Sequence, residues 1–293
     1  MLAKVIKWTL ISAFLLNISS NLKALENNIV VATYAYSGID RVAAIKPLSQ
    51  FVNHSTGQKT NIRIYESPSK LIDAFAKGDV SLIVPNLSGY LVALSRKLPA
   101  EPIVVPDVPF AKATQYRSIL LANVNSFLKS DVDIATHASK ISVALVWSDS
   151  TSGGIIPLQR FKEIGIKSPN NEFSSLEYFG SHQKSLEALL TSKVDLAGLA
   201  LGVFKSYLEE NPSIDQKYKI IWSSSPIPVG PILCRTNEYL KCDKLKHDLL
   251  NLHDDNSNIL ASLNMGWPEF GGAKRFIAPQ LSKYQHLTNV LNE

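Results

Sequence analysis

Short, nearly continuous apolar runs alternate along the chain with segments whose apolar residues recur at helical spacing. Residues 29–33 (IVVAT) have the pattern of a buried strand, and residues 39–53 place apolar side chains on one helical face. Strands are expected at 29–33, 61–65, 80–84, 116–123, 140–147, 176–179, 194–201, 219–222 and 232–235, and helices at 39–53, 68–77, 89–96, 155–164, 183–191, 204–210 and over much of 244–292. This alternation predicts α/β units with mostly parallel sheets.

A proline-rich passage at residues 99–109 divides the pattern into two halves. Each half carries its own strands and helices, and a chain of 293 residues is long enough for two units of roughly 100–150 residues. The sequence therefore predicts two α/β units with a cleft between them.

Composition and charge narrow the class of protein. The chain is 45% hydrophobic and 19% charged, which excludes an intrinsically disordered protein, and its two cysteines exclude a disulfide-built miniprotein. The formal net charge is +5, but Lys4, Lys7 and Lys23 lie within residues 1–24, which contain no acidic residue. The remainder carries only about +2, too little to indicate a nucleic-acid partner.

The N-terminus has the pattern of a secretory signal. Two lysines in the first seven residues precede a short apolar run at 8–18, and a small residue, Ala24, follows a polar stretch. We expect residues 1–24 to be a signal peptide cleaved after Ala24, which places the mature protein in a bacterial periplasm. The alternative is an uncleaved anchor, although the run is shorter than the roughly 18–20 residues that span a membrane. No cysteine follows the run to carry a lipid anchor.

Cys234 and Cys242 would then lie in an oxidising compartment. They can pair only if residues 237–241 turn back tightly. A buried, unpaired Cys234 on a strand is the alternative, and the sequence leaves both open.

The candidate chemistry centres on residues 149–154 (DSTSGG), between an expected strand and an expected helix. Ser150, Thr151 and Ser152 supply neutral hydrogen-bond donors, and Gly153 lets a ligand approach the backbone. The helix that follows offers unpaired N–H groups with partial positive charge, which suits an oxyanion such as phosphate or phosphonate. An ordinary helix cap with glycines in a turn is the alternative.

Three further junctions carry donor side chains. His182 begins an expected helix, Asn86 and Ser88 lie between a strand and a helix in the first half, and Tyr34 and Tyr36 follow the first strand. In open α/β sheets, ligands bind outside the carboxyl ends of the strands, where all these residues are expected to lie. A surface histidine and tyrosines packed at the sheet edge are the alternatives.

These motifs resemble those of the periplasmic phosphate/phosphite/phosphonate-binding proteins of ABC importers, which have the type II periplasmic binding protein fold. The resemblance rests on residues 149–157, 180–182, 194–197, 225–228, 231–232, 235, 266–267, 79–80 and 86–88. It implies two lobes, with residues 25–115 and 236–293 in lobe 1 and residues 116–235 in lobe 2. It also implies a hinge near 113–117 and 235–240 and a ligand cleft between the lobes.

In relatives that bind aminoalkylphosphonates, acidic residues hold the ammonium group. The positions that resemble them are Gly202 and Val229-Gly230, which are not acidic. An ammonium would therefore lack its counter-charge, so phosphate, phosphite or a simple phosphonate is the expected ligand.

The expected function is capture of a small phosphorus oxyanion between two lobes and its delivery to an ABC permease. We expect a monomer without enzymatic activity, cofactor, metal or nucleic-acid partner. One alternative is a sensory module coupled to a receptor or kinase. Another is a secreted hydrolase using Ser150 or Ser152 with His182, but the chain has no G-x-S-x-G elbow there.

Overall fold

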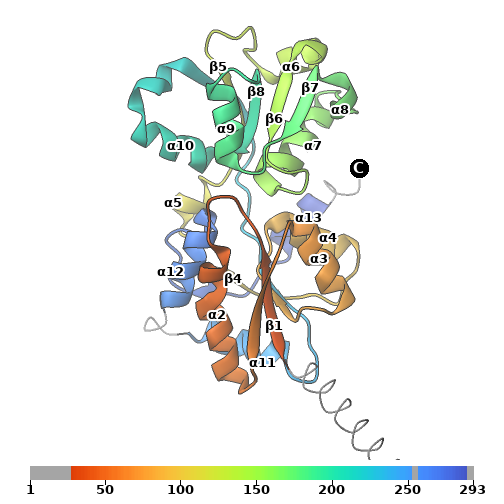
Figure 1. The fold of residues 1–293 in the computed structure, drawn as a ribbon, viewed down its shortest axis with the longest axis vertical. Helices are drawn as coiled ribbons and strands as arrows, with labels where there is room; N and C mark the ends of the chain where they lie inside the picture. Colours follow the sequence, from red (N-terminus) through yellow and green to blue (C-terminus); the bar gives the residue numbers. More distant parts are fainter. Residues whose placement is uncertain (1–27, 253–256, 289–293) are drawn as a thin grey trace, which may run out of the picture.

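The computed structural model describes residues 28–252 and 257–288 and contains two α/β lobes, one above the other (Figure 1). Each lobe is built on its own sheet, one of six strands and one of five. The predicted signal peptide, residues 1–24, lies outside the described residues. Within the described ranges, no helix is both long and apolar enough to cross a membrane.

The first lobe contains the six-stranded sheet. Its strands run in the order β11 (Phe276–Ile277), β4 (Glu101–Pro106), β10 (Ile232–Cys234), β3 (Leu82–Ile83), β1 (Ile29–Tyr34) and β2 (Thr60–Tyr65). β1 pairs in parallel with β2 and β3, whereas β10 and β11 pair in antiparallel fashion with their neighbours. The sheet is therefore mixed, and only its β2-β1-β3 part is parallel as expected.

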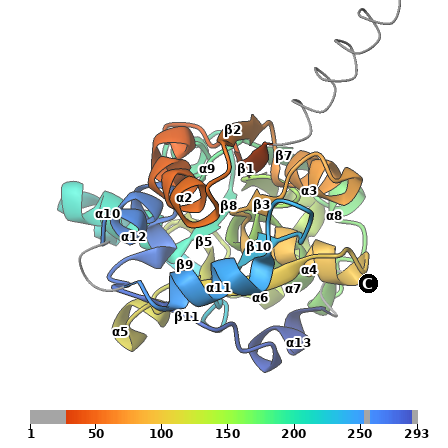
Figure 2. The same ribbon diagram turned by 90° about the horizontal axis from the view of Figure 1, so that it is seen from below.

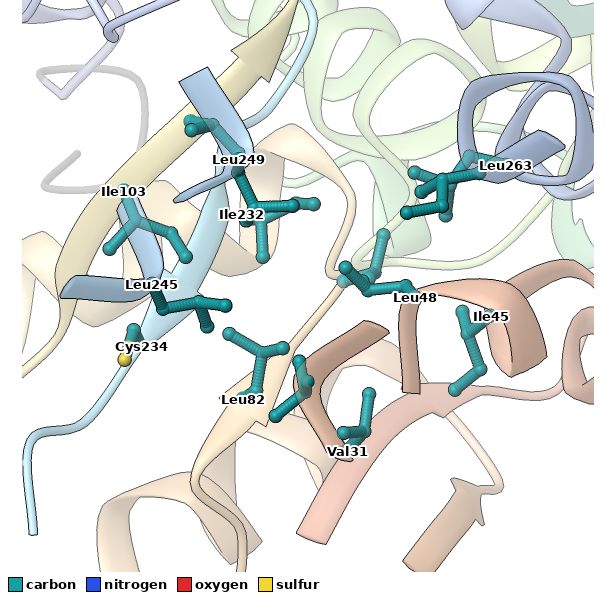
Figure 3. Packing of buried hydrophobic residues seen from close by; sticks show 14 of the residues in the cluster. Val31, Ile45, Leu48, Leu82, Ile103, Ile232, Cys234, Leu245, Leu249 and Leu263 are labelled. Carbon is teal, nitrogen blue, oxygen red and sulfur yellow. The ribbon is translucent and has the colours of Figure 1, made fainter. Parts of the chain in front are cut away.

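Helices cover both faces of this sheet because β1 is apolar on both sides (Figure 2). Val31 faces a core that includes Ile45 and Leu48 of α2 (Arg41–Thr56) (Figure 3), while Val30 and Ala32 belong to a second core. The first core also takes side chains from α11 (Cys242–Leu250) and α12 (Ser257–Gly266), and the second from α3 (Pro68–Lys77), α4 (Leu87–Ser95) and α13 (Ser282–Thr288).

The second lobe repeats this arrangement around five strands. Their order is β7 (Ser175–Tyr178), β6 (Ser142–Leu145), β8 (Leu196–Ala200), β5 (Ser118–Asn123) and β9 (Tyr218–Ser223), and β5 is antiparallel to both of its neighbours. One face packs against α6 (Asp131–His137), α7 (Ile156–Glu163) and α8 (Pro169–Glu172), and the other against α9 (His182–Leu190) and α10 (Leu201–Glu210) (Figure 1).

The chain passes between the two sheets at residues 107–117 and 224–231. These crossings run together: the N–H of Ile227 donates to the carbonyl of Tyr116 at 2.8 Å, and Arg117 Nη1 donates to the carbonyl of Ser224 at 2.6 Å. The first crossing contains α5 (Phe110–Ala113) and overlaps residues 113–117. That these residues act as a hinge stays a prediction.

The second crossing corrects an expectation. Residues 232–235 were expected in lobe 2 and a hinge segment at 235–240, but β10 pairs with β3 and β4 in the first sheet. The second lobe therefore ends before residue 232. A three-residue apolar strand carries no information about which sheet it joins, since either sheet would bury it.

The two cysteines form a disulfide, which resolves the alternatives that the sequence left open. Cys234 of β10 and Cys242 of α11 are bonded, with Cα atoms 5.8 Å apart, inside the first core. The turn between them is held by Asn237, whose Oδ1 accepts from the N–H groups of Tyr239 and Leu240 at 2.9 and 2.8 Å. The bond ties β10 to α11 within the first lobe.

Candidate functional site

The strand-to-helix junctions expected to carry chemistry meet between the two lobes. The backbone carbonyl of Asp149 accepts from Asn86 Nδ2 at 3.0 Å and from Ser88 Oγ at 2.5 Å. The N–H of Ser88 donates to Thr151 Oγ1 at 3.0 Å. Asn86 also begins α4, because its Oδ1 accepts from the N–H of Gly89. The loop after β3 in lobe 1 therefore lies directly against the loop after β6 in lobe 2.

The hydroxyl loop of lobe 2 is a cap followed by a widened helical turn. Ser150 Oγ accepts from the N–H of Gly153 at 3.3 Å, and the N–H of Ile155 reaches back five residues to the carbonyl of Ser150 at 2.8 Å. Such π-type turns are rare in proteins, and those that occur often lie at functional sites. Within the described part of the chain, the N–H groups of Thr151 and Ser152 have no acceptor. Both are therefore free donors in this turn.

The two glycines of the loop are required for packing. A Cβ on Gly153 would lie 2.2 Å from Val146 Cγ2 and 2.8 Å from His182 Cε1, and one on Gly154 would lie 1.9 Å from the carbonyl oxygen of Trp147. Gly153 was expected to let a ligand approach the backbone closely. The atoms that a side chain would meet here are those of the protein itself, including the imidazole that the loop faces.

His182 lies beside the hydroxyl loop in a defined protonation state. Its Nδ1 accepts from the N–H of Ala200 at 3.2 Å, so the ring proton is on Nε2, which faces Ser152 Oγ at 3.4 Å. Burial, with a contribution from the positive charge of Arg41, lowers the pKa of His182 to about 4. At neutral pH the ring is therefore an uncharged hydrogen-bond donor.

Tyr36 connects the first lobe to this histidine. Its hydroxyl oxygen accepts from the N–H of His182, in the first turn of α9, at 3.0 Å. Burial raises the pKa of Tyr36 to about 12, so the phenol keeps its proton. Tyr34 is only 5% exposed, and no hydrogen bond joins it to lobe 2 among the described residues. Of the two tyrosines, Tyr36 makes the contact across the lobes, and the ring of Tyr34 packs against Arg41.

Ser152 is the most enclosed of the three hydroxyl residues. It is 2% exposed, and its carbonyl accepts from Ser118 Oγ at 2.7 Å. Burial raises the pKa of the neighbouring Tyr116 well above its usual value, and a hydrogen bond from Ser152 partly opposes the rise. Tyr116 could not be identified from the sequence, because it lies in a crossing segment without a strand-to-helix pattern.

Arg41 is the principal residue that the sequence analysis missed. It is 6% exposed, and its guanidinium carbon lies 4.0 Å from the ring centre of Tyr34, 5.0 Å from that of Tyr36 and 4.5 Å from that of Trp267. Its Nε donates to the carbonyl of Gly266 at 3.2 Å. The site therefore contains a buried positive charge beside its neutral donors, and an arginine in the first turn of an amphipathic helix gave no sign of burial.

Comparison with known proteins identifies the family. A sequence model described as "ABC transporter, phosphonate, periplasmic substrate-binding protein" matches residues 31–275. The chain belongs to this family. No curated protein sequence matches it. The predictions of a two-lobed binding-protein fold and of a substrate-binding transport component, rather than an enzyme, are confirmed, and membership in a transporter family favours this role over a sensory module.

Solved structures agree on the fold. PhnD1 from Prochlorococcus marinus (MIT 9301), solved with methylphosphonate, is 16% identical, with a TM-score of 0.69 and 91% of this chain and 97% of that chain covered. A binding protein component of an ABC phosphonate transporter from Pseudomonas aeruginosa is 20% identical, with a TM-score of 0.68 and coverage of 90% and 85%. XAC2383 from Xanthomonas citri, solved with ATP, is 14% identical, with a TM-score of 0.70 and coverage of 91% and 97%.

The site offers donors suited to an oxyanion. No group of three or more His, Cys, Asp or Glu side chains that could hold a metal occurs among the residues described. Hydrogen-bond donors from the loop of lobe 2, the ring of His182 and the hydroxyl of Tyr36 converge on one region between the lobes. Such an arrangement can bind and orient an anion by hydrogen bonding.

Proposed function

We propose that this protein binds a small phosphorus oxyanion between its lobes and delivers it to an ABC permease. A phosphonate fits the family best, and phosphate and phosphite share the same tetrahedral acceptor group. The proposed ligand-binding residues are Ser150, Thr151, Ser152, Gly153, His182, Tyr36, Tyr34, Asn86 and Ser88. The observation that carries the proposal is the buried pair formed by neutral His182 Nε2–H and Ser152 Oγ beside two unused backbone N–H groups.

Neutral hydrogen-bond donors can bind this ligand tightly because the acceptor oxygens of the ligand are negatively charged. Hydrogen bonds from uncharged N–H and O–H groups to an anionic oxygen are stronger than those between two neutral groups. The N–H groups of Thr151 and Ser152, the ring N–H of His182 and the phenol of Tyr36 can each donate to a different oxygen. Ser150 and Asn86 act indirectly, since their side-chain oxygens cap the loop and α4.

Closure of the lobes would couple ligand binding to delivery. Ser88 of lobe 1 donates to both Asp149 and Thr151 of lobe 2, so the first-lobe junction contacts the loop proposed to hold the anion. A ligand that bridges the two lobes stabilises the closed arrangement relative to the open one. A permease that recognises the closed form would therefore select loaded protein.

We further propose that residues 1–24 direct export to the periplasm and are cleaved there, and that the mature protein is a monomer without a nucleic-acid partner. The mass of the protein recovered from the periplasm tests the cleavage. A mass corresponding to residues 25–293 is expected. A mass that still includes residues 1–24 would contradict cleavage after Ala24.

Calorimetric titration of the ligand-stripped mature protein tests the binding proposal. Methylphosphonate, phosphite and phosphate are titrated separately, with sulfate as a tetrahedral anion of different protonation chemistry. We expect saturable binding of at least one phosphorus oxyanion, with a decrease in the radius of gyration as the lobes close. Absence of binding to all three phosphorus anions would overturn the proposed function.

A further inference from the structure

Arg41 is a buried cation without a counter-ion. It takes part in none of the ion pairs found among the described residues, and its Nη1 is buried with no hydrogen-bond partner there. An unpaired charge inside a protein costs several kcal/mol in lost hydration. Arg41 is 6% exposed and always protonated, so its charge is buried without an anionic partner among the described residues.

The surroundings of Arg41 satisfy only part of this demand. The rings of Tyr34, Tyr36 and Trp267 face its guanidinium, and one carbonyl, that of Gly266, accepts from Nε. Glu269 interacts electrostatically with Arg41 but does not lie within ion-pair distance of it, and burial raises the pKa of the Glu269 carboxyl. Aromatic faces stabilise a cation less than an anion would, so Nη1 of Arg41, which has no hydrogen-bond partner among the described residues, remains available to an anion.

Arg41 lies at the edge of the proposed anion site. The ring of Tyr36 contacts the guanidinium, at 5.0 Å, and the imidazole of His182, with 6.3 Å between ring centres. The charge of Arg41 is close enough to lower the pKa of His182. Arg41 belongs to lobe 1, whereas His182 and the hydroxyl loop belong to lobe 2. The proposed site therefore has a cationic group on its lobe 1 side and neutral hydrogen-bond donors on its lobe 2 side.

We propose that Arg41 binds a second acidic group of the ligand, so that the preferred ligands are phosphonates that also carry a carboxylate. This inference rests on the proposed function. The phosphonate end takes the neutral donors of lobe 2, and the carboxylate pairs with the terminal nitrogens of Arg41. With aromatic rings facing the guanidinium, its in-plane N–H groups are the ones left to donate, and a planar carboxylate matches them in a bidentate arrangement.

The same charge disfavours an aminoalkyl tail. An ammonium near Arg41 would meet a like charge in a region of low dielectric constant. A plain alkylphosphonate would leave Arg41 unpaired. A carboxylate tail should therefore be preferred to a neutral alkyl tail, and a neutral alkyl tail to an ammonium tail, on ligands that share the phosphonate group.

Titration of the ligand-stripped protein with phosphonoacetate, methylphosphonate and 2-aminoethylphosphonate tests this ranking. We expect phosphonoacetate to bind at least about tenfold more tightly than methylphosphonate, because a buried charge-assisted pair is added, and 2-aminoethylphosphonate to bind most weakly. Equal or tighter binding of methylphosphonate would overturn the inference while leaving the proposed function intact. Absence of binding to all three would overturn both.

Arg41→Met tests whether the preference for phosphonoacetate depends on this residue, because methionine removes the charge but keeps an apolar side chain against the rings. The ratio of the methylphosphonate to the phosphonoacetate dissociation constant should fall to near one. A ratio that stays at its wild-type value, whether both affinities persist or both are lost equally, would overturn the inference. Arg41→Lys, which keeps the charge but not the planar fork, should retain part of the preference.

Arg235→Met is the matched control. Arg235 is also in lobe 1, faces an aromatic ring, that of Phe75, and donates to a backbone carbonyl, that of Ala76. It lies beside Ser81, at the amino end of β3 and away from lobe 2. Its replacement should leave the ligand preference unchanged. If Arg235→Met lost as much of the preference for phosphonoacetate as Arg41→Met does, the preference would reflect a general effect of charge, and the assignment to Arg41 would be overturned.

Discussion

The carboxylate of Asp149 in lobe 2 accepts two hydrogen bonds from Ser69 in lobe 1, one from its N–H at 2.9 Å and one from its Oγ at 2.5 Å. Ser69 lies in the first turn of α3, where free N–H groups and the helix dipole favour a negative charge. Asp149 directly precedes the hydroxyl loop. This contact therefore joins the two lobes next to the proposed anion site and belongs to the closed arrangement.

Replacement of Asp149 by asparagine should weaken ligand binding without unfolding either lobe. The variant loses the charge at the start of α3, which contributes about 0.3–1 kcal/mol at an exposed position, and part of the stabilisation of the closed form. We expect a dissociation constant raised by about two- to fivefold and a larger radius of gyration at subsaturating ligand, measured by calorimetry and small-angle scattering.

Asp195→Asn is the control for this prediction. Asp195 accepts from the N–H and Oγ of Ser142 at 2.8 and 2.6 Å, which is the same pair of contacts made within one lobe. This variant should lower thermal stability slightly and leave ligand affinity unchanged. Equal losses of affinity in the two variants would refute the role of Asp149 in closure.

Ser152→Ala should weaken anion binding more than it weakens the fold. Its hydroxyl lies beside His182 Nε2 in a buried region, so its loss removes a donor that a bound anion would use. We expect a loss of about 1–3 kcal/mol of binding free energy, measured by calorimetry. Ser95→Ala, which removes an exposed hydroxyl that bonds within α4, should bind like the wild type. Unaltered affinity in Ser152→Ala would remove this residue from the site.

Gly153→Ala should destabilise lobe 2. The added methyl group would lie 2.2 Å from Val146 Cγ2 and 2.8 Å from His182 Cε1, so the loop or the imidazole must shift. Overpacking of this kind costs roughly 1–3 kcal/mol, measurable as a fall in the free energy of unfolding in urea. Gly202→Ala adds the same methyl group in α10, where nothing lies within 4 Å, and should be neutral or stabilising. Equal stability of the two variants would contradict the packing argument.

The junctions of the site could be predicted because each has a local signature. Ser150, Asn86 and the residue before His182, Ser181, all cap helices through side-chain oxygens, and caps at strand-to-helix junctions are readable from residue type and spacing. Strand–helix alternation likewise predicts that such junctions meet at one edge of each sheet. The local pattern thus identified the loops that the structure brings together.

The parts that could not be predicted depend on contacts distant in sequence. β4 lies in the passage taken as a linker, since Pro102 and Pro106 lack the N–H that a strand interior normally uses. Arg41 is buried by residues as distant as Trp267, and no helical pattern distinguishes a buried arginine from an exposed one. The pairing of Cys234 with Cys242 depends on a turn held by the side chain of Asn237, which spacing alone leaves undetermined.

The stability of the ligand-free protein should depend on pH through His182. Its pKa is lowered from 6.5 to about 4 in the folded protein, so the unfolded chain binds more protons between these values. The contribution of His182 to the free energy of unfolding is therefore fully present above about pH 6.5 and is lost as the pH falls toward 4. The loss from this group is roughly 3 kcal/mol at most. The free energy of unfolding in urea, measured from pH 7 to 4.5, should decline less steeply in His182→Asn than in the wild type. His54→Asn, at an exposed position on α2, should retain the wild-type slope. A decline in His182→Asn parallel to that of the wild type would show that this imidazole is not held neutral.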